Sequence, residues 1–317
     1  MDVSIILANW NVKDLMRGAL RSVYEQTRDI SYEVIVVDDG STDGSVEMLR
    51  AEFPSVIIIE NKKNVGFSKA NNQAAAIAKG RYVFLLNTDT LLVDNVIKTF
   101  VDYLEAHQEV GVCGGWLKNA DGTSQVSFGS FPSFTQAIAD AFYLNDMFPK
   151  AHFPRRGVLP DGSIIAPKEV DYVTGAAILI RNELIEQLGL FDEFYHAYSE
   201  ETDFCYRVKH TVHKKIMFLP SASVTHFGGF SYRNVRKFQI QLMCSSTHKF
   251  LTKYHGQIYS FITRLLYAWH YGVKIPVRFV RYLIASPAIK EEKRKYLLHA
   301  WYEVRYILAP NEEFTGS

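Results

Sequence analysis

Cysteine is scarce in this chain, and long apolar runs are absent from it. The 317 residues include three cysteines, Cys113, Cys205 and Cys244, and no CxxC pair. Neither a disulfide framework nor a thiolate zinc site is expected, and a reducing cytosol suits the chain. No apolar stretch approaches the roughly 18 residues of a membrane-spanning helix, and no basic segment precedes the apolar start at Val3. Neither a spanning helix nor a signal peptide is predicted.

Three catalytic motifs are also missing. The sequence has no GxGxxG after a strand, no GxxxxGK[ST] and no GxSxG. Their absence argues against a dinucleotide-binding oxidoreductase, a P-loop phosphotransferase and an α/β-hydrolase. The charge is almost balanced, with 35 basic and 34 acidic residues, so no nucleic-acid partner is expected. With 48% hydrophobic and 22% charged residues, the composition is that of a globular protein.

The first 115 residues alternate between strand and helix patterns. The strand patterns are continuous apolar runs, and the helical ones repeat every three or four residues. This alternation predicts a parallel sheet covered by helices on both faces, with ligands beyond the carboxyl ends of its strands. The expected strands are Val3–Ala8, Glu33–Asp38, Val56–Glu60, Arg81–Leu86 and Val110–Gly114, and the expected helices are Val12–Gln26, Ser45–Glu52, Phe67–Ala78 and Val93–His107.

The rest of the chain divides into three stretches. Residues 116–168 are rich in Gly and Pro, which predicts long loops and short helices that form a mobile lid or an acceptor-binding insertion. Regular patterns then return, and from Ser231 to near Leu308 the chain is predicted to be helical. Between these stretches the expected strands are Ala176–Ile180, Lys215–Leu219 and Ser223–His226, and the expected helices are Glu183–Leu188 and Glu200–His210.

Two polar clusters follow apolar strands and should share one sheet edge. Asp38-Asp39-Gly40-Ser41 is either a capped turn or a site where a carboxylate accepts a hydrogen bond from a nucleotide base or ribose. In Asn87-Thr88-Asp89, Asp89 either caps the next helix or, with Asn87, binds Mg²⁺ or Mn²⁺ beside substrate phosphates.

Three further candidates lie elsewhere. Lys69, in the first turn of an expected helix, is either solvated or in reach of a phosphate. Glu200, Glu201 and Asp203 begin another helix, where Ser199 is a candidate N-cap; one carboxylate is a candidate general base. His226, before Gly228 and Gly229, is either structural or a contact to metal or diphosphate.

Together these motifs resemble those of family 2 glycosyltransferases with the GT-A fold, especially the bacterial rhamnosyltransferase-like branch. The resemblance covers about residues 1–230, and the order and spacing of the motifs carry it. They are Val3–Asn11, Val37–Ser41, Asn64–Phe67, Leu86–Thr90, Thr174–Ala176, Gly189–Glu193, Ser199–Asp203 and His226–Gly229.

The resemblance implies an α/β GT-A fold with a mostly parallel sheet. Residues 1–230 would be the catalytic domain, with a nucleotide-sugar half at 1–115 and an acceptor half at 116–230. It also implies an inverting, metal-dependent transfer of one sugar from a nucleotide-diphosphate donor, with dTDP-rhamnose suggested by the branch, to a glycan or lipid-linked saccharide. Because the QxxRW motif of processive synthases is absent, transfer of a single sugar is favoured.

Roles for individual residues follow from the same resemblance. The family places its catalytic base, an aspartate, at the position of Glu201, although Glu200 and Asp203 remain rivals on the acceptor side. Asp39 would hold the nucleotide base, and a divalent cation, Mg²⁺ or Mn²⁺, would bind at Asp89. The predicted donor-binding residues are Ala8, Asn11, Asp39, Lys69, Asn87, Thr88 and Asp89, and the predicted metal ligands are Asp89 and His226.

Two other functions stay open. One is a catalytically silent glycan-binding homologue, which Asn87 and Glu201 favour as departures from the family pattern. The other is a nucleotide-sugar pyrophosphorylase, which shares the sheet architecture but has a Gly-rich N-terminal loop that this chain lacks.

The balanced charge conceals a division along the chain. Residues 231–317 hold 14 basic and 5 acidic residues, a net charge of +9, and 16 of the 43 aromatic residues. One interpretation is a helical appendage packed on the catalytic domain or in a homodimer. The other is a surface for an anionic membrane, which would place a cytoplasmic enzyme peripherally on the inner face of the cell membrane, near a lipid-linked acceptor.

Overall fold

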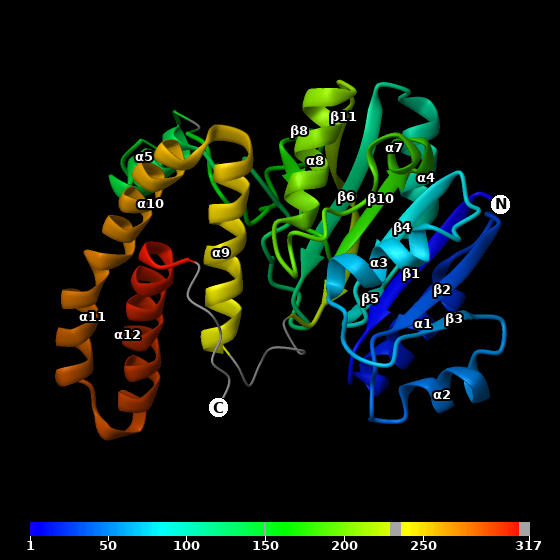
Figure 1. Ribbon diagram of the computed structural model, residues 1–317, viewed down its shortest axis with the longest axis horizontal. Coiled ribbons are helices and arrows are strands. Elements are labelled where there is room, and N and C mark those ends of the chain that lie inside the picture. Colours follow the sequence, from blue (N-terminus) through cyan, green and yellow to red (C-terminus); the bar gives the residue numbers. More distant parts are fainter. Residues whose placement is uncertain (149, 152, 229–235, 311–317) are drawn as a thin grey trace. The chain divides into compact units, whose positions relative to one another are not determined.

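The computed structural model describes residues 1–148, 150–151, 153–228 and 236–310 (Figure 1). The chain divides into two compact units. The first, here called the sheet unit, comprises Met1–Phe131 and Gly157–Ser231; the second, the helical unit, comprises Pro132–Arg156 and Tyr232–Ser317. The functional boundaries at residues 115 and 230 stay predictions.

Half of the central sheet is parallel, as the apolar strand runs predicted. Its strand order begins β3-β2-β1-β4, and all three pairings are parallel. Of these, β1, β2 and β4 are nearly continuous buried runs because helices cover both of their faces. Their bounds are β1 Val3–Asn9, β2 Tyr32–Asp38, β3 Ile57–Glu60 and β4 Tyr82–Leu86.

The other half of the sheet is mixed. It continues β10-β6-β11-β5, with β8 paired to β11. From the pairings, six of the nine strands in the described residues run in one direction, so the predicted mostly parallel sheet is confirmed. The bounds are β5 Thr90–Leu92, β6 Val110–Lys118, β8 Lys168–Val170, β10 Ala177–Arg181 and β11 Lys215–His226; β7 Phe128–Gly129 and β9 Tyr172–Val173 form a separate pair.

Three features of this half differ from the predictions. The strand at Ala177–Arg181 lies antiparallel between β4 and β6, a position and a direction that the sequence did not predict. Residues 215–226 form one strand rather than two; its register shifts between Leu219 and Ser223, around Pro220, which has no N–H for the ladder. The short β5 was not predicted, and because it pairs with β11, the next helix begins at Val96 rather than Val93.

Helices of the sheet unit cover both faces of the sheet, as predicted. Side chains of α1, α2 and α4 pack with one set of strand residues, including Ile5. Side chains of α3, α7 and α8 pack with the alternate set, including Ile6. The helices are α1 Lys13–Gln26, α2 Ser45–Glu52, α3 Phe67–Ala75, α4 Val96–Ala106, α7 Asn182–Leu188 and α8 Glu200–Thr211.

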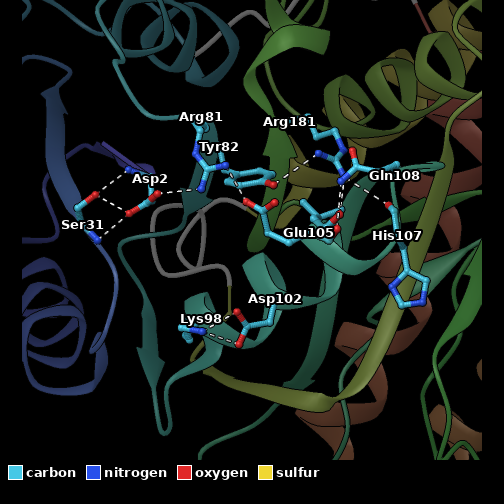
Figure 2. A network of polar contacts seen from close by, with 11 residues as sticks. Asp2, Ser31, Arg81, Tyr82, Lys98, Asp102, Glu105, His107, Gln108 and Arg181 are labelled. Atoms are coloured by element: carbon cyan, nitrogen blue, oxygen red, sulfur yellow. Dashed lines mark hydrogen bonds and ion pairs between the residues drawn. The ribbon is translucent and has the colours of Figure 1, made fainter.

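A buried arginine fixes the inserted strand β10. Arg181, at the end of this strand, donates to the carbonyl oxygen of His107, just after α4 (Figure 2). It also donates to the carbonyl oxygens of Leu104, in the last turn of α4, and of Val110, the latter at 2.7 Å. A cation at the C-terminus of a helix satisfies carbonyls that lack an intrahelical partner. Arg181 thus anchors one end of β10, while its other end, Ala177, pairs with Leu86 at the carboxyl edge of the parallel strands.

The helical unit joins the C-terminal helices to a segment from the middle of the chain. That segment is part of the stretch predicted to form a mobile lid or an acceptor-binding insertion. In it, α5 packs on α10, and the Tyr267 hydroxyl donates to Gln136 at 2.7 Å. Among the described residues, no helix has the length and apolarity needed to cross a membrane. The helices are α5 Phe134–Ala141, α6 Leu144–Met147, α9 Arg236–His255, α10 Gln257–Gly272, α11 Lys274–Leu283 and α12 Pro287–Leu308. Residues 231–235 of the predicted helical tail lie outside the described residues.

Candidate active site

The parallel strands bring the predicted donor-binding loops to one edge. In the register of β1 and β2, Asn9 pairs with Asp38, so the loops that follow both strands begin side by side. Asn87 follows β4, on the other side of β1. The edge carries Asp38, Asp39, Asn87 and Asp89, as predicted from the strand ends.

Asp39 organises the loop before α3. The carboxylate is buried, and its oxygens accept hydrogen bonds from the backbone N–H groups of Val65 and Gly66 and from Asn61 Nδ2, at 2.9–3.1 Å. A carboxylate has about four acceptor positions, and these contacts engage both oxygens. The predicted contact of Asp39 with a nucleotide base stays a prediction.

The loop after β1 is held by side chains of the loop after β2. Ser41 Oγ accepts from Asn9 Nδ2 at 3.1 Å and from the Asn11 N–H at 2.9 Å. Asn11 has a φ of 53°, and its Oδ1 accepts from the Thr42 N–H at 2.7 Å. Asn11 therefore stabilises the backbone here, and Ala8, half-buried, precedes it. Their predicted contacts with the donor remain predictions.

Lys69 lies in the first turn of α3 and is exposed. The structure shows neither an ion pair nor a hydrogen bond between its side chain and any other described residue. The helix itself is fixed, because Asn72 exchanges hydrogen bonds with the backbone of Phe191 and Ser68 Oγ donates to the Tyr195 carbonyl. A fixed helix with an unpaired cation in its first turn suits binding of an anion.

Asp89 and His226 face each other across the edge. Oδ1 of Asp89 lies 3.2 Å from Nε2 of His226, and both side chains are mostly buried. β5 and β11 position the pair, since Thr90 pairs with His226. Asp89 is not the predicted helix cap, because α4 begins seven residues later, at Val96. Gly229, which belongs to the same motif, lies outside the described residues.

Gln125, a residue that the sequence did not indicate, sets the orientation of His226. Gln125 Nε2 donates to Asn119 Oδ1 at 2.6 Å and to the His226 carbonyl, so its Oε1 is the acceptor for Nδ1 of His226, at 2.8 Å. This network assigns the proton of neutral His226 to Nδ1 and leaves the Nε2 lone pair directed toward Asp89. Because 101 residues separate Gln125 from His226, no local motif could have revealed the contact.

The pair of Asp89 and His226 fits a divalent cation. Two ligands at right angles, each about 2.1 Å from a cation, lie about 3.0 Å apart, close to the observed 3.2 Å. The described residues hold no group of three or more His, Cys, Asp and Glu side chains suited to a metal ion. Any cation here would therefore need further oxygen ligands, such as those of a substrate diphosphate.

Asn87 and Thr88 connect this pair to the loop before β10. The Asn87 N–H donates to the Ala176 carbonyl at 2.9 Å, and its own carbonyl accepts from Thr90 Oγ1. Thr88 is buried. Their predicted contacts with the donor stay predictions.

The three acidic residues of α8 have different surroundings. A Cβ atom at Gly175 would lie 3.6 Å from Cβ and Cγ of Glu201, so the Glu201 side chain lies over the loop that Asn87 contacts. Asp203 is fully buried; it forms an ion pair with Arg207 at 2.8 Å and accepts from the Tyr195 hydroxyl. Ser199 occupies the predicted N-cap position, but its side chain forms no capping hydrogen bond; its carbonyl accepts from the Asp203 N–H.

Glu200 is a buried carboxyl group beside Glu201. Desolvation raises its pKa well above the ordinary 4.5, and the charge of Glu201 adds to this effect. Within the described residues its Oε2 has no hydrogen-bond partner. A neutral Glu200 next to Glu201 leaves Glu201 as the better candidate for a charged base at this helix end.

Glu200→Gln is expected to change how stability depends on pH. The folded protein binds the Glu200 proton more tightly than the unfolded chain, so the stability gained from that proton is complete below pH 4.5 and declines as the pH rises. Glutamine stays neutral at every pH. The melting temperature of the variant, relative to that of the wild type, should therefore rise from about pH 5 to about pH 8. Melting curves in one buffer series measure this. The exposed Glu47→Gln serves as control, and equal pH slopes for Glu200→Gln and the wild type would contradict the prediction.

The sheet and its edge define a GT-A-like fold. A model of glycosyl transferase family 2 matches residues 4–188, more than half of the chain. The protein belongs to this family.

Similar proteins agree with this assignment. The chain is 28% identical over 198 residues to the UDP-Glc:alpha-D-GlcNAc-diphosphoundecaprenol beta-1,3-glucosyltransferase WfaP of Escherichia coli, covering 62% of this chain and 78% of that one. It is 24% identical over 240 residues to an N-acetylglucosaminyl-diphospho-decaprenol L-rhamnosyltransferase of Mycobacterium tuberculosis, covering 70% and 75%. Its match to the uncharacterized glycosyltransferase YfnE of Bacillus subtilis, 32% identical, covers 37% of this chain but spans less than a third, 31%, of that relative's length.

A solved structure has the same fold. The mannosyltransferase PcManGT from Pyrobaculum calidifontis, in complex with GDP-Man and Mn²⁺, superimposes with a TM-score of 0.62. The alignment covers 98% of this chain and 88% of that one, at 16% identity.

Proposed function

We propose that the protein is an inverting, metal-dependent glycosyltransferase that moves one sugar from a nucleotide-diphosphate donor to a saccharide hydroxyl. The observation that carries this proposal is the facing pair of Asp89 and His226 at the carboxyl edge, next to the loop that Glu201 covers. Such a transfer needs a cation site for the leaving diphosphate and a base for the acceptor hydroxyl, and candidates for both lie at this edge.

The proposed reaction is a single displacement. Glu201 removes the proton of the acceptor hydroxyl, whose oxygen forms a bond to the anomeric carbon while the bond from that carbon to the diphosphate breaks. The configuration inverts because the acceptor attacks from the side opposite the leaving group. Lys69 offers a positive charge to the departing diphosphate, and Asp89 and His226 would hold Mg²⁺ or Mn²⁺, which supplies further positive charge there. The remaining donor-binding residues that we propose are Asp39, Ala8, Asn11, Asn87 and Thr88.

For the substrates, we propose dTDP-rhamnose as donor and a lipid-linked saccharide as acceptor. The relative from M. tuberculosis is described as an L-rhamnosyltransferase, and both it and WfaP are described as acting on saccharides linked to a polyprenol diphosphate. WfaP is described as using UDP-Glc, so UDP sugars are the first competing donors. A lipid-linked acceptor agrees with a cytoplasmic enzyme at the inner face of the membrane.

A donor panel tests the proposed function. Incubation with dTDP-rhamnose, UDP sugars and GDP sugars in the presence of Mn²⁺ should give slow release of nucleoside diphosphate from one donor. The same donor should raise the melting temperature, because a ligand that binds only the folded state stabilises it. Consumption of a sugar phosphate with a nucleoside triphosphate would instead identify a pyrophosphorylase. Glycan binding without turnover on any donor or acceptor would identify a catalytically silent homologue.

A further inference from the structure

The outer side of α10 and α11 carries a long apolar stripe. Ten large apolar side chains, nine on these two helices and Ile284 directly after α11, are between 44% and 78% exposed. They recur at helical spacing, so they share one face of the two consecutive helices. The apolar stripe consists of Ile258, Phe261, Ile262, Leu265, Trp269, Val277, Phe279, Val280, Leu283 and Ile284.

The opposite face of these helices already has a partner within the helical unit. Tyr267 is buried there and contacts Gln136, and Arg264 donates to the Ile307 carbonyl of α12. On α11, Arg278 donates to the Tyr296 carbonyl of α12. Figure 1 shows α11 beside α12, in orange and red. The apolar stripe is therefore not the face that holds the helical unit together.

The charge on α10 and α11, which carry the apolar stripe, has one sign, and the nearest acids in the sequence that follows are Glu291 and Glu292 of α12. Residues 257–290 contain five Lys and Arg and no Asp or Glu. Near the turn between α11 and α12, Arg281 and Lys290 are both exposed beside Leu283 and Ile284. A second copy of the chain would bring the same cations against them, whereas an anionic surface complements them.

We propose that the apolar stripe lies in the interface of an anionic lipid bilayer, with α10 and α11 parallel to the membrane plane. An apolar helix face flanked by cations binds at this depth without spanning, and Trp269 near its middle is a side chain that favours the interface. The long side chains of Arg281 and Lys290 can reach lipid phosphates while the apolar residues contact acyl chains. Binding of the bilayer requires neither donor nor turnover, so the proposal does not depend on the proposed transfer reaction.

Co-sedimentation with vesicles tests the proposal. The full chain should pellet with vesicles of phosphatidylcholine containing about one third phosphatidylglycerol, and at least about tenfold less with phosphatidylcholine alone. The double variant Trp269→Glu/Val280→Glu should bind the anionic vesicles at least about tenfold more weakly. The matched control, Ile77→Glu/Val93→Glu, makes the same change of charge at exposed apolar positions of the sheet unit and should bind like the wild type.

Fluorescence locates the contact without a disruptive substitution. Brominated lipids should quench part of the wild-type tryptophan emission, and Trp269→Phe should lose that quenching while still pelleting. No pelleting of the wild type, or equal binding by the two double variants, would overturn the proposal. A dimer in sedimentation equilibrium that Trp269→Glu/Val280→Glu dissociates, without vesicle binding, would instead assign the apolar stripe to a second copy.

Discussion

Glu201→Gln is expected to lower the turnover number by about 10²–10⁴-fold while the affinity for the donor stays unchanged. Glutamine has the shape of glutamate but cannot accept the proton of the acceptor hydroxyl. The side chain lies over Gly175 in the first turn of α8, and a side chain of the same shape is expected to keep the packing there. Steady-state kinetics with the active donor and calorimetric titration of that donor measure the two quantities separately.

Two further variants separate the base from its neighbours. Asp203→Asn breaks the ion pair with Arg207, which also holds the carbonyls of Leu188 and Gly189, so its main effect should be a lower melting temperature. Glu183→Gln, an exposed acid in the first turn of α7, should change neither turnover nor stability. Near wild-type turnover of Glu201→Gln would disprove its role, and a loss of turnover in Asp203→Asn at unchanged melting temperature would transfer that role to Asp203.

The parallel half of the sheet was predictable because the burial of each strand is visible in the residues of that strand alone. Strands such as β2 and β4 are buried on both faces, so their apolar runs are continuous and end in polar residues at a shared edge. The insertion of β10 between β4 and β6 was not predictable, since a short apolar run carries no information about the direction or identity of its neighbours. Arg181, which anchors β10, is recognisable only when the carbonyls of α4 are seen beside it.

The candidate site was also predictable in part and unpredictable in part. Asp89 and His226 were each indicated by their position after a strand, but the orientation of His226 depends on Gln125, which comes from a loop outside every motif. Spacing alone could not show which carboxylate of α8 is the best candidate base, because all three are acids at the start of one helix. Glu200, Glu201 and Asp203 differ only in their burial and their partners. Burial raises the pKa of Glu200, and Arg207 forms an ion pair with Asp203, which is why Glu201 is the base that we propose.

Asp89→Ala is expected to abolish the dependence of donor binding on the cation. Substitution of residues that only orient a metal ligand costs about 10–100-fold in metal affinity, so loss of a ligand itself should cost at least about 100-fold. His226 alone would remain, held by Gln125, and the cation would lose the only carboxylate that faces this histidine in the described residues. Calorimetric titration of the donor with and without Mn²⁺ measures the effect, and wild-type protein treated with a chelator should behave like the variant.

The matched control is Asp94→Ala, which removes an exposed carboxylate from the loop just after β5. It changes the charge by the same amount as Asp89→Ala, but at a different position. It should bind donor and Mn²⁺ like the wild type. If Asp89→Ala retained the full increase in donor affinity on addition of Mn²⁺, the pair with His226 would be an ion pair of the fold, formed between a carboxylate and an imidazolium at 3.2 Å. Both ring nitrogens of His226 would then donate, Nδ1 to Gln125 and Nε2 to Asp89.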